Sequence, residues 1–329
     1  MLSESQILTL INGAQSLQEA LQMTYNNNDH TREEEFFTAL RLYFGNKPGC
    51  EIIETHKKRV RMPNAQRGCE ISDLLIISYS RHIPILKINF LQAKKVDLTS
   101  SSFGLLLSQQ QTPINFKFHL DAVQYKLLND CPMINPLQTG LPNDILFNSC
   151  SPAITSYGVF YKNPIIGKID MAYEITQLLH LESSNVIKPR SKYRTCNFAT
   201  VSSISGGLLW RDACGLQKPP YKTKCHSVFW DDLYSTLNAE TFEYALKHFR
   251  IGSPLCKIAA QKFANDMIQA FLPGDSQGIN FKRVVRLHFG DGVFNSRDDR
   301  REIPPEANHI YEGFREPRYI MLVDIDHIE

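Results

Sequence analysis

Two neighbouring apolar runs constrain the fold of this chain more than any other feature. Residues 73–80 (DLLIISYS) and 84–95 (PILKINFLQAKK) are rich in aliphatic side chains and are separated by a short polar stretch. Runs of this length between turn residues predict buried strands, and the short connection predicts that the two strands pair. The chain is therefore expected to contain a buried sheet to which both strands belong.

The same reasoning predicts the other elements of the chain. Helices are expected over residues 4–24, 31–44, 116–132, 167–181, 230–249 and 254–272. Strands are expected over residues 50–55, 154–161, 281–292 and 318–326. The order helix, three strands, helix, strand within residues 31–161 predicts a mixed α/β core. A length of 329 residues exceeds that of a usual single domain.

Composition excludes several classes of protein. The net charge is only +2, so any surface that binds nucleic acid must be a local one. No apolar run has the roughly 18 residues that a membrane-spanning helix needs, and the first residues do not form a convincing signal peptide. None of the eight cysteines lies in a CxxC pair, which is typical of reduced thiols. We therefore expect a cytoplasmic protein without a membrane partner.

Polar residues stand at the ends of the two central strands. Asp73 opens the first strand, and Gln92 and Lys94 close the second. Because successive residues of a strand face opposite sides, Gln92 and Lys94 share a face, while Ala93 between them faces the other way and leaves its carbonyl at the edge. One register of the strand pair places Asp73 close to Gln92 and Lys94. Strand ends are also solvated, so each of these residues taken alone has an ordinary structural explanation.

Taken together, these residues predict a metal site. Mg²⁺ (or Mn²⁺) prefers hard oxygen ligands, which the Asp73 carboxylate, the Gln92 amide and the Ala93 carbonyl can supply. The ammonium of Lys94 can orient a water molecule or stabilise charge on a phosphate. This combination is suited to hydrolysis of a phosphodiester bond.

The arrangement resembles the PD-(D/E)XK nuclease superfamily, which has the restriction-endonuclease-like fold. The matching residues are Ser72-Asp73 on one strand and Gln92-Ala93-Lys94 on the next, within a resemblance that covers about residues 20–180. Most members of the superfamily have an acid where this chain has Gln92. The QxK form is similar to the branch with Mrr-type restriction enzymes and nucleases of bacterial defence systems. The resemblance implies a Mg-dependent DNA endonuclease, such as the effector of an anti-phage defence system.

The resemblance also implies a further acid on the helix before the sheet. At 100° per residue, Glu33 is expected near the middle of the apolar stripe of helix 31–44, with Glu34 at its border and Glu35 pointing away. Glu33 is thus the expected additional metal ligand and Glu34 the second choice. Lys95 and Gln124, a glutamine on the helix after the lysine strand, are further candidates.

A basic loop precedes the two central strands. It contains Lys57, Lys58, Arg59, Arg61 and Arg67, which are expected to hold DNA phosphates without reading sequence. A solvated turn is the alternative explanation of this charge.

The expected organisation is a nuclease domain at residues 1–185 and an α+β region at residues 186–329. The second region is expected to act as a sensor, to bind a partner protein, or to mediate self-association. The alternative to an active nuclease is a catalytically weak protein of the same fold that binds DNA, or an interaction subunit of a larger complex.

Overall fold

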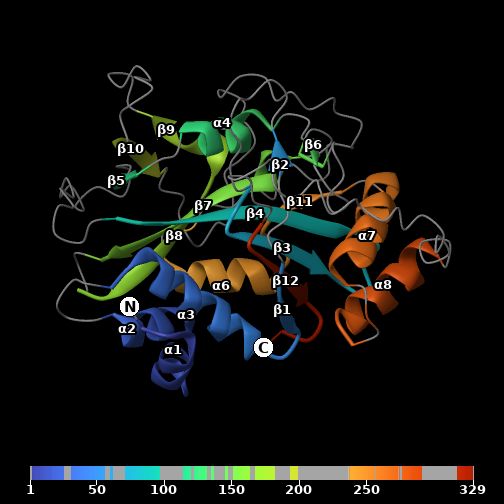
Figure 1. Ribbon diagram of the computed structural model, residues 1–329, viewed down its shortest axis with the longest axis horizontal. Coiled ribbons are helices and arrows are strands. Elements are labelled where there is room, and N and C mark those ends of the chain that lie inside the picture. Colours follow the sequence, from blue (N-terminus) through green and yellow to red (C-terminus); the bar gives the residue numbers. More distant parts are fainter. Residues whose placement is uncertain are drawn as a thin grey trace, which may run out of the picture.

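The structure of the chain is a computed structural model (Figure 1). It describes residues 2–25, 31–55, 60–61, 71–96, 114–119, 122–131, 135–136, 145–146, 151–163, 167–181, 193–198, 236, 238–255, 257–272, 274, 276–290 and 317–328. The expected α/β class is confirmed, since a mixed sheet of seven strands is flanked by helices.

The main sheet has the strand order β1-β12-β3-β4-β7-β8, and β11 pairs with β4 outside this path. The strands are β1 (Cys50–Glu54), β3 (Leu74–Tyr79), β4 (Leu86–Lys95), β7 (Thr155–Lys162), β8 (Ile169–Ile175), β11 (Ser253–Pro254) and β12 (Tyr319–Asp324). The pairs β12–β3 and β4–β7 are parallel, and the others are antiparallel. Every residue of β3 is buried, as its unbroken apolar run predicts for a central strand.

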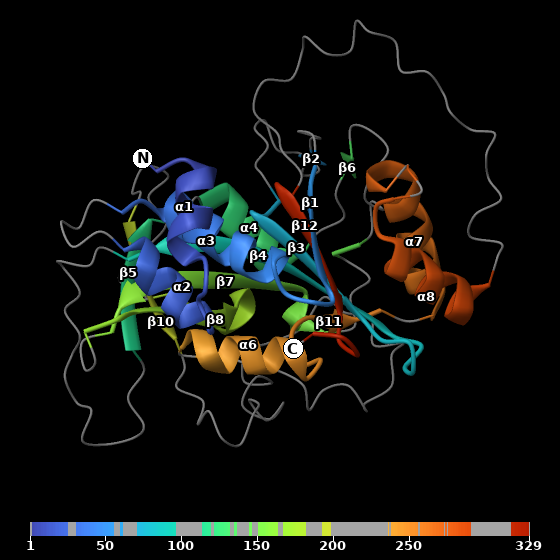
Figure 2. The same cartoon turned by 90° about the horizontal axis from the view of Figure 1, so that it is seen from below.

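Helices cover both faces of this sheet, as Figures 1 and 2 show. The helices are α1 (Glu4–Ile11), α2 (Leu17–Thr24), α3 (Glu33–Gly45), α4 (Ala122–Asp130), α6 (Ala239–Lys247), α7 (Lys257–Phe271) and α8 (Ile279–Phe289). Leu74 and Leu91 pack in one hydrophobic cluster with residues of α1, α2, α3 and α6. Leu75 and Phe90 pack in a second cluster with residues of α4, α7 and α8. Alternate residues of β3 and β4 thus serve opposite layers.

Two smaller sheets complete the described part. One has the order β5-β10-β9, from β5 (Ile114–His119), β10 (Tyr193–Phe198) and β9 (His180–Leu181). The other pairs β2 (Val60–Arg61) with β6 (Asn135–Pro136). Among the described residues, no helix is both long and apolar enough to cross a membrane.

The expected single helix over residues 4–24 is wrong, because the chain forms two helices there. The hydroxyl of Ser3 accepts a hydrogen bond from the Gln6 N–H (3.3 Å), and that of Ser16 accepts one from the Glu19 N–H (3.2 Å). Each serine therefore caps the start of its own helix. Gly13, between the helices, has a φ of +92°, which ends α1.

Three other expectations are wrong in whole or in part. Residues 116–119, expected to begin a helix, belong to β5, and α4 begins at Ala122. Residues 169–175 form β8 rather than a helix, and residues 279–289 form α8 rather than a strand. All residues of β8 are buried, so the segment has no alternation that would indicate a strand. In α8 the buried residues are Phe281, Val284, Val285 and Phe289, which is a helical spacing hidden by the β-branched pair.

The main sheet takes strands from both sides of the expected boundary at residue 185. β12, drawn in red in Figure 2, lies between β1 and β3 and pairs with both. The main sheet is therefore not confined to residues 1–185. A sensor or partner-binding role for residues 186–329 stays a prediction.

Candidate active site

The candidate site lies at one end of the central strands of the main sheet, where β3 begins and β4 ends. This end of the sheet is called the edge below. In the antiparallel register, Leu74 pairs with Leu91 and Leu75 with Phe90. One residue earlier in β3, the N–H of Asp73 donates to the Leu91 carbonyl at 3.1 Å. Asp73 is therefore opposite Gln92 on the face that α4 covers, in the register that brings the two side chains together.

The carboxylate of Asp73 is held by the residues that follow in β4. Its Oδ2 accepts from the backbone N–H of Ala93 at 2.7 Å and from Nε2 of Gln92 at 2.5 Å. The Ala93 side chain faces the opposite layer, as predicted from the alternation of a strand. Hydrogen bonds to an ionised acceptor are among the stronger ones in proteins, so they fix the orientation of this carboxylate.

Gln92 forms a chain of side chains that continues to α4. Its Oε1 accepts from Nε2 of Gln124, while its own Nε2 donates to Asp73. Both glutamines are buried, with 3% and 6% of their surface exposed. Gln124, treated from sequence as a further candidate only, thus lies in direct contact with the predicted metal ligand Gln92.

Lys94 and Lys95 attach the end of β4 to the start of α3. Nζ of Lys94 lies 3.2 Å from Oε1 of Glu33, and the N–H of Lys95 donates to the other carboxylate oxygen at 3.0 Å. Nζ of Lys95 donates to the carbonyl of Thr31 at 2.6 Å. Glu33 therefore reaches this edge from the layer opposite to α4. The structure thus pairs Asp73 with Gln92 and Lys94 with Glu33 at the same end of β4, and the chemical roles of these residues stay predictions.

The reasoning that selected Glu33 from its helical phase is wrong. Glu35, expected to point away, is the buried acid of the three, and Glu33 is only half-buried. The carboxylate of Glu35 accepts from the N–H of Leu2 at 2.6 Å and of Arg32 at 2.7 Å. Contacts with the N-terminal segment, which helical phase cannot predict, therefore account for its burial. Glu34 is exposed and forms an ion pair with Arg318.

The donors at this edge suit a hard cation. Asp73 and Glu33 offer carboxylate oxygens. Gln92 can offer its amide oxygen if that oxygen gives up the hydrogen bond from Gln124 and binds the cation instead. In the orientation observed, the amide nitrogen of Gln92 faces the Asp73 carboxylate, because the reverse orientation would set the amide oxygen against that carboxylate. The set has one acid fewer than an all-carboxylate site. In the part of the chain that the structure describes, no group of three or more His, Cys, Asp or Glu residues could hold a metal ion.

The basic loop lies mostly outside the described residues. Lys57, Lys58, Arg59 and Arg67 belong to segments that are not described, and Arg61 is placed only as a backbone position in β2. Their expected contact with DNA stays a prediction.

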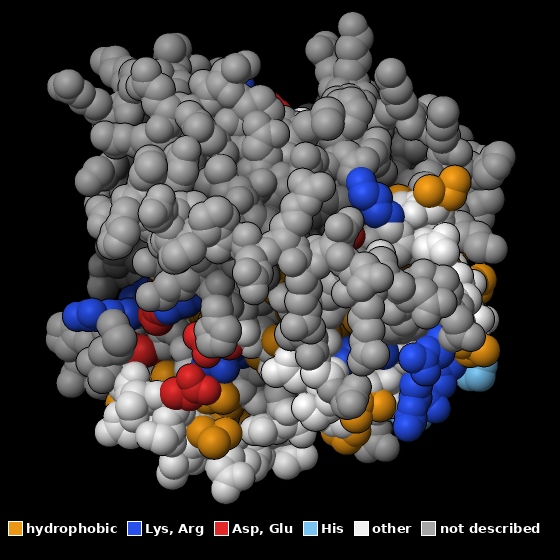
Figure 3. Space-filling view, turned by 45° about the vertical axis from the view of Figure 1, so that its right-hand side comes forward, with side chains coloured by type: hydrophobic (Ala, Val, Ile, Leu, Met, Phe, Trp, Pro, Cys, Tyr) orange, Lys and Arg blue, Asp and Glu red, His pale blue; other side chains and the backbone are white. Residues whose placement is uncertain are grey.

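A second group of cations was missed because residues 281–292 were expected to be a strand. Lys282, Arg283 and Arg286 lie on α8, which has no acidic residue. Figure 3 shows Lys and Arg side chains gathered at the lower right, the side where Figure 1 shows α7 and α8. The ring of Phe281 on α8 packs against that of Tyr79, so these cations lie at the end of β3 opposite to Asp73.

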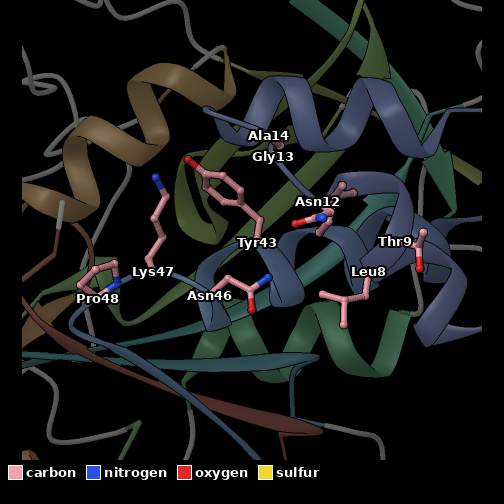
Figure 4. A pocket seen from close by; sticks show the side chains of 10 residues that line it. Leu8, Thr9, Asn12, Gly13, Ala14, Tyr43, Asn46, Lys47 and Pro48 are labelled. Atoms are coloured by element: carbon pink, nitrogen blue, oxygen red, sulfur yellow. The ribbon is translucent and has the colours of Figure 1, made fainter.

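A cavity of about 700 Å³ lies elsewhere, between α1 and the end of α3. Its lining includes Leu8, Asn12, Tyr43, Asn46 and Lys47, shown in Figure 4. The Tyr43 hydroxyl donates to Glu243 at 2.8 Å, and burial raises its pKa above the ordinary range of tyrosine. None of the predicted site residues lines this cavity.

Comparisons with known proteins show no relative of this chain. No family model, no curated protein and no solved structure matches the chain. The contacts among β3, β4 and α3 at this end of the sheet are therefore the basis for a functional proposal.

Proposed function

We propose that this chain is a divalent-metal-dependent DNA endonuclease with a restriction-endonuclease-like core. The observation that carries the proposal is the cross-strand meeting of Asp73 and Gln92, with Lys94 and Glu33 at the same edge. An acid, an amide and an ammonium on two adjacent strands supply both metal ligands and a cation for a phosphate. A role as the effector of an anti-phage defence system rests on the resemblance of the QxK motif alone.

The order of elements supports the fold part of the proposal. Apart from the strands of the two smaller sheets, α3 is followed by β1, β3 and β4, then by α4 and by β7, which is parallel to β4. This is the order expected of the core from the sequence. The insertion of β12 between β1 and β3 is a departure from three consecutive neighbouring strands.

Each residue has a distinct part in the proposed reaction. Asp73, the Gln92 amide oxygen, the Ala93 carbonyl and Glu33 would hold Mg²⁺ or Mn²⁺, which when bound makes hydroxide available near neutral pH. Lys94 stabilises negative charge on the phosphate being attacked. Gln124 holds the Gln92 amide in place through their hydrogen bond.

The test is cleavage of plasmid DNA by the purified chain with Mg²⁺, Mn²⁺ or a chelator. Asp73→Asn and Lys94→Ala are expected to lower the cleavage rate by about 100-fold or more, because each removes a charged group that acts in the transition state. Lys126→Ala is the matched control, since this lysine is exposed on α4 and pairs with Asp130. Cleavage by both site variants at the wild-type rate would refute the proposed site.

A protein that binds DNA without cutting it is the second candidate. The observation in its favour is that Gln92 replaces an acid and uses both polar atoms of its amide in contacts within the protein. Binding of a labelled DNA duplex that does not change with metal, together with no cleavage in either metal, would favour this candidate. Cleavage that requires metal would exclude it.

A further inference from the structure

Two ion pairs from consecutive residues of α3 lie at the edge of the candidate site. Glu33 pairs with Lys94 at the end of β4, and Glu34 pairs with Arg318 just before β12. The first pair involves a residue already assigned to the proposed reaction. The second involves an arginine about 245 residues from Asp73 in sequence, which neither the motif nor its spacing indicates.

Backbone hydrogen bonds place Arg318 next to Asp73. The N–H of Arg318 donates to the Ser72 carbonyl at 3.2 Å, and the N–H of Tyr319 donates to the Asp73 carbonyl at 3.1 Å. In the parallel register Tyr319 pairs with Leu74, so Arg318 is the neighbour of Asp73 on the adjacent strand. Neighbouring strands are about 4.8 Å apart, so the backbone of Arg318 lies one strand spacing from that of Asp73, the proposed metal ligand.

The Arg318 side chain is accessible to a ligand at this position. In the ion pair, the side chains of Arg318 and Glu34 are 39% and 45% exposed. A solvent-exposed ion pair contributes little net stability, so another anion can take the place of the carboxylate. The guanidinium also lies 5.8 Å from the centre of the Tyr319 ring, which limits the directions it can take.

We propose that Arg318 binds a phosphate of the DNA backbone beside the bond that is cut, and that Glu34 occupies this position in the free protein. The planar guanidinium binds phosphate through two parallel hydrogen bonds, a geometry that it shares with carboxylate binding. Glu34 is therefore an internal competitor of the substrate. The identity of the partner as DNA rests on the proposed function, whereas the exchange of partners by Arg318 is argued from the exposure of its ion pair with Glu34.

A purely structural role for the pair predicts a different outcome. If the pair served only to join α3 to β12, removing either partner would have the same effect. As a phosphate site with an internal competitor, the pair predicts effects of opposite sign, because removal of Glu34 releases the arginine and removes a charge that repels phosphate.

The experiment measures binding of a short fluorescent DNA duplex by anisotropy in chelator, over a series of salt concentrations. Arg318→Ala is expected to weaken binding by about tenfold and to reduce the magnitude of the salt slope by about one, as for one lost phosphate contact. Arg318→Lys should bind with intermediate affinity, because lysine retains the charge without the planar fork. Glu34→Gln should bind more tightly than wild type, because the arginine is released and a repelling charge is lost.

Arg81→Ala is the matched control. Arg81 pairs with Asp324 at 3.6 Å at the other end of β3 and is about as exposed as Arg318, so its loss should leave DNA binding unchanged. Thermal unfolding of each variant shows whether a change in affinity comes from a loss of fold. Wild-type affinity of Arg318→Ala, or a Glu34→Gln variant that does not bind more tightly than wild type, would overturn the inference.

The inference can fail while the proposed function stands. Cleavage of plasmid by wild type, combined with unchanged binding and cleavage by Arg318→Ala, refutes only the role of Arg318. Absence of both binding and cleavage in wild type refutes the proposed function and the inference together. Loss of cleavage in Asp73→Asn with retained binding supports the division of roles between Asp73 and Arg318.

Discussion

Among single residues, Gln92 has the greatest influence on how strongly the proposed site can hold a metal. Its amide donates to Asp73 and accepts from Gln124, so it connects β3, β4 and α4 at one point. A neutral amide avoids the repulsion that a second carboxylate would have with Asp73 in the absence of metal. The same neutrality lowers the affinity for a cation. Gln92 thus favours a site that is stable when empty over one that binds metal tightly.

Gln92→Glu should reverse this balance. Without metal, the new carboxylate would lie against Asp73, and we expect the free energy of unfolding to fall by about 1–2 kcal/mol. Mg²⁺ should restore this stability, since two adjacent carboxylates bind the ion more tightly. Thermal unfolding in chelator and in Mg²⁺ measures both effects. Gln177→Glu is the control, because the amide of Gln177 donates to the Asn129 carbonyl, where metal should bring no recovery. Equal stability of Gln92→Glu in the two conditions would contradict a metal site here.

The residues of the site were predictable from sequence to different degrees. Alternation along a strand and a short turn, both local properties of the chain, predicted Asp73 beside Gln92 in one of the possible registers, and the structure has that register. The burial of Glu35 was not predictable, since it depends on the N-terminal segment. Arg318 was missed because no local pattern relates a residue before β12 to the start of β3.

At the scale of elements, the layer formed by α2, α6 and β8 depends on one buried acid. Asp170 is the second residue of β8. Its carboxylate accepts from the N–H of Ala239 at 2.6 Å and of Met171 at 3.0 Å, and from Nε2 of Gln18 at 3.2 Å. Burial raises the pKa of Asp170, while these three donors oppose the shift. The carboxylate therefore connects the start of α6 and the surface of α2 to the last strand of the sheet.

Asp170→Ala should lower the free energy of unfolding by about 2–4 kcal/mol, because it leaves buried backbone donors without their acceptor. Asp170→Asn should cost less, since its amide oxygen can still accept. Chemical denaturation measures both changes. Glu240→Ala, in the first turn of α6 but exposed, is the control, with an expected change within about 0.5 kcal/mol. A change of that size for Asp170→Ala would refute the connecting role.

The elements themselves were predicted best where one face is buried and the other is exposed. Helix α3 has such a face, and its position was predicted closely. In β8 both faces are covered, so its sequence does not show the alternation of apolar and polar residues that indicates a strand. In α8 two adjacent valines favour a strand locally, and only the packing of the helix on Tyr79 and its neighbours overrides this preference.

At the scale of the whole molecule, the sheet joins distant parts of the chain. β12 pairs with β1 on one side and with β3 on the other, and its residues are all buried. Without this strand, β1 would lose its partner and β3 would have an unpaired edge. Separating the chain at residue 185 would therefore remove from the main sheet the strand between β1 and β3.

Removal of residues 317–329 should prevent cooperative folding. Four aliphatic or thioether side chains of β12 are buried, and each contributes about 1.5–3 kcal/mol, a total comparable with the whole stability of a typical domain. Thermal unfolding followed by circular dichroism should show no cooperative transition. Leu322→Ala, a milder change, should lower the free energy of unfolding by about 2–5 kcal/mol. Leu287→Ala on the exposed face of α8 should have little effect. A truncated chain that unfolds cooperatively near the wild-type temperature would contradict this account.

The position of β12 also has a consequence during protein synthesis. The start of β3, where Asp73 lies, can pair with β12 and lie beside Arg318 only after residues 317–324 have emerged from the ribosome. A chain that lacks residues 317–324 therefore lacks part of the site on which the proposed cleavage depends. For an enzyme that cuts DNA, this order of assembly would keep chains without β12 inactive and would require no inhibitor.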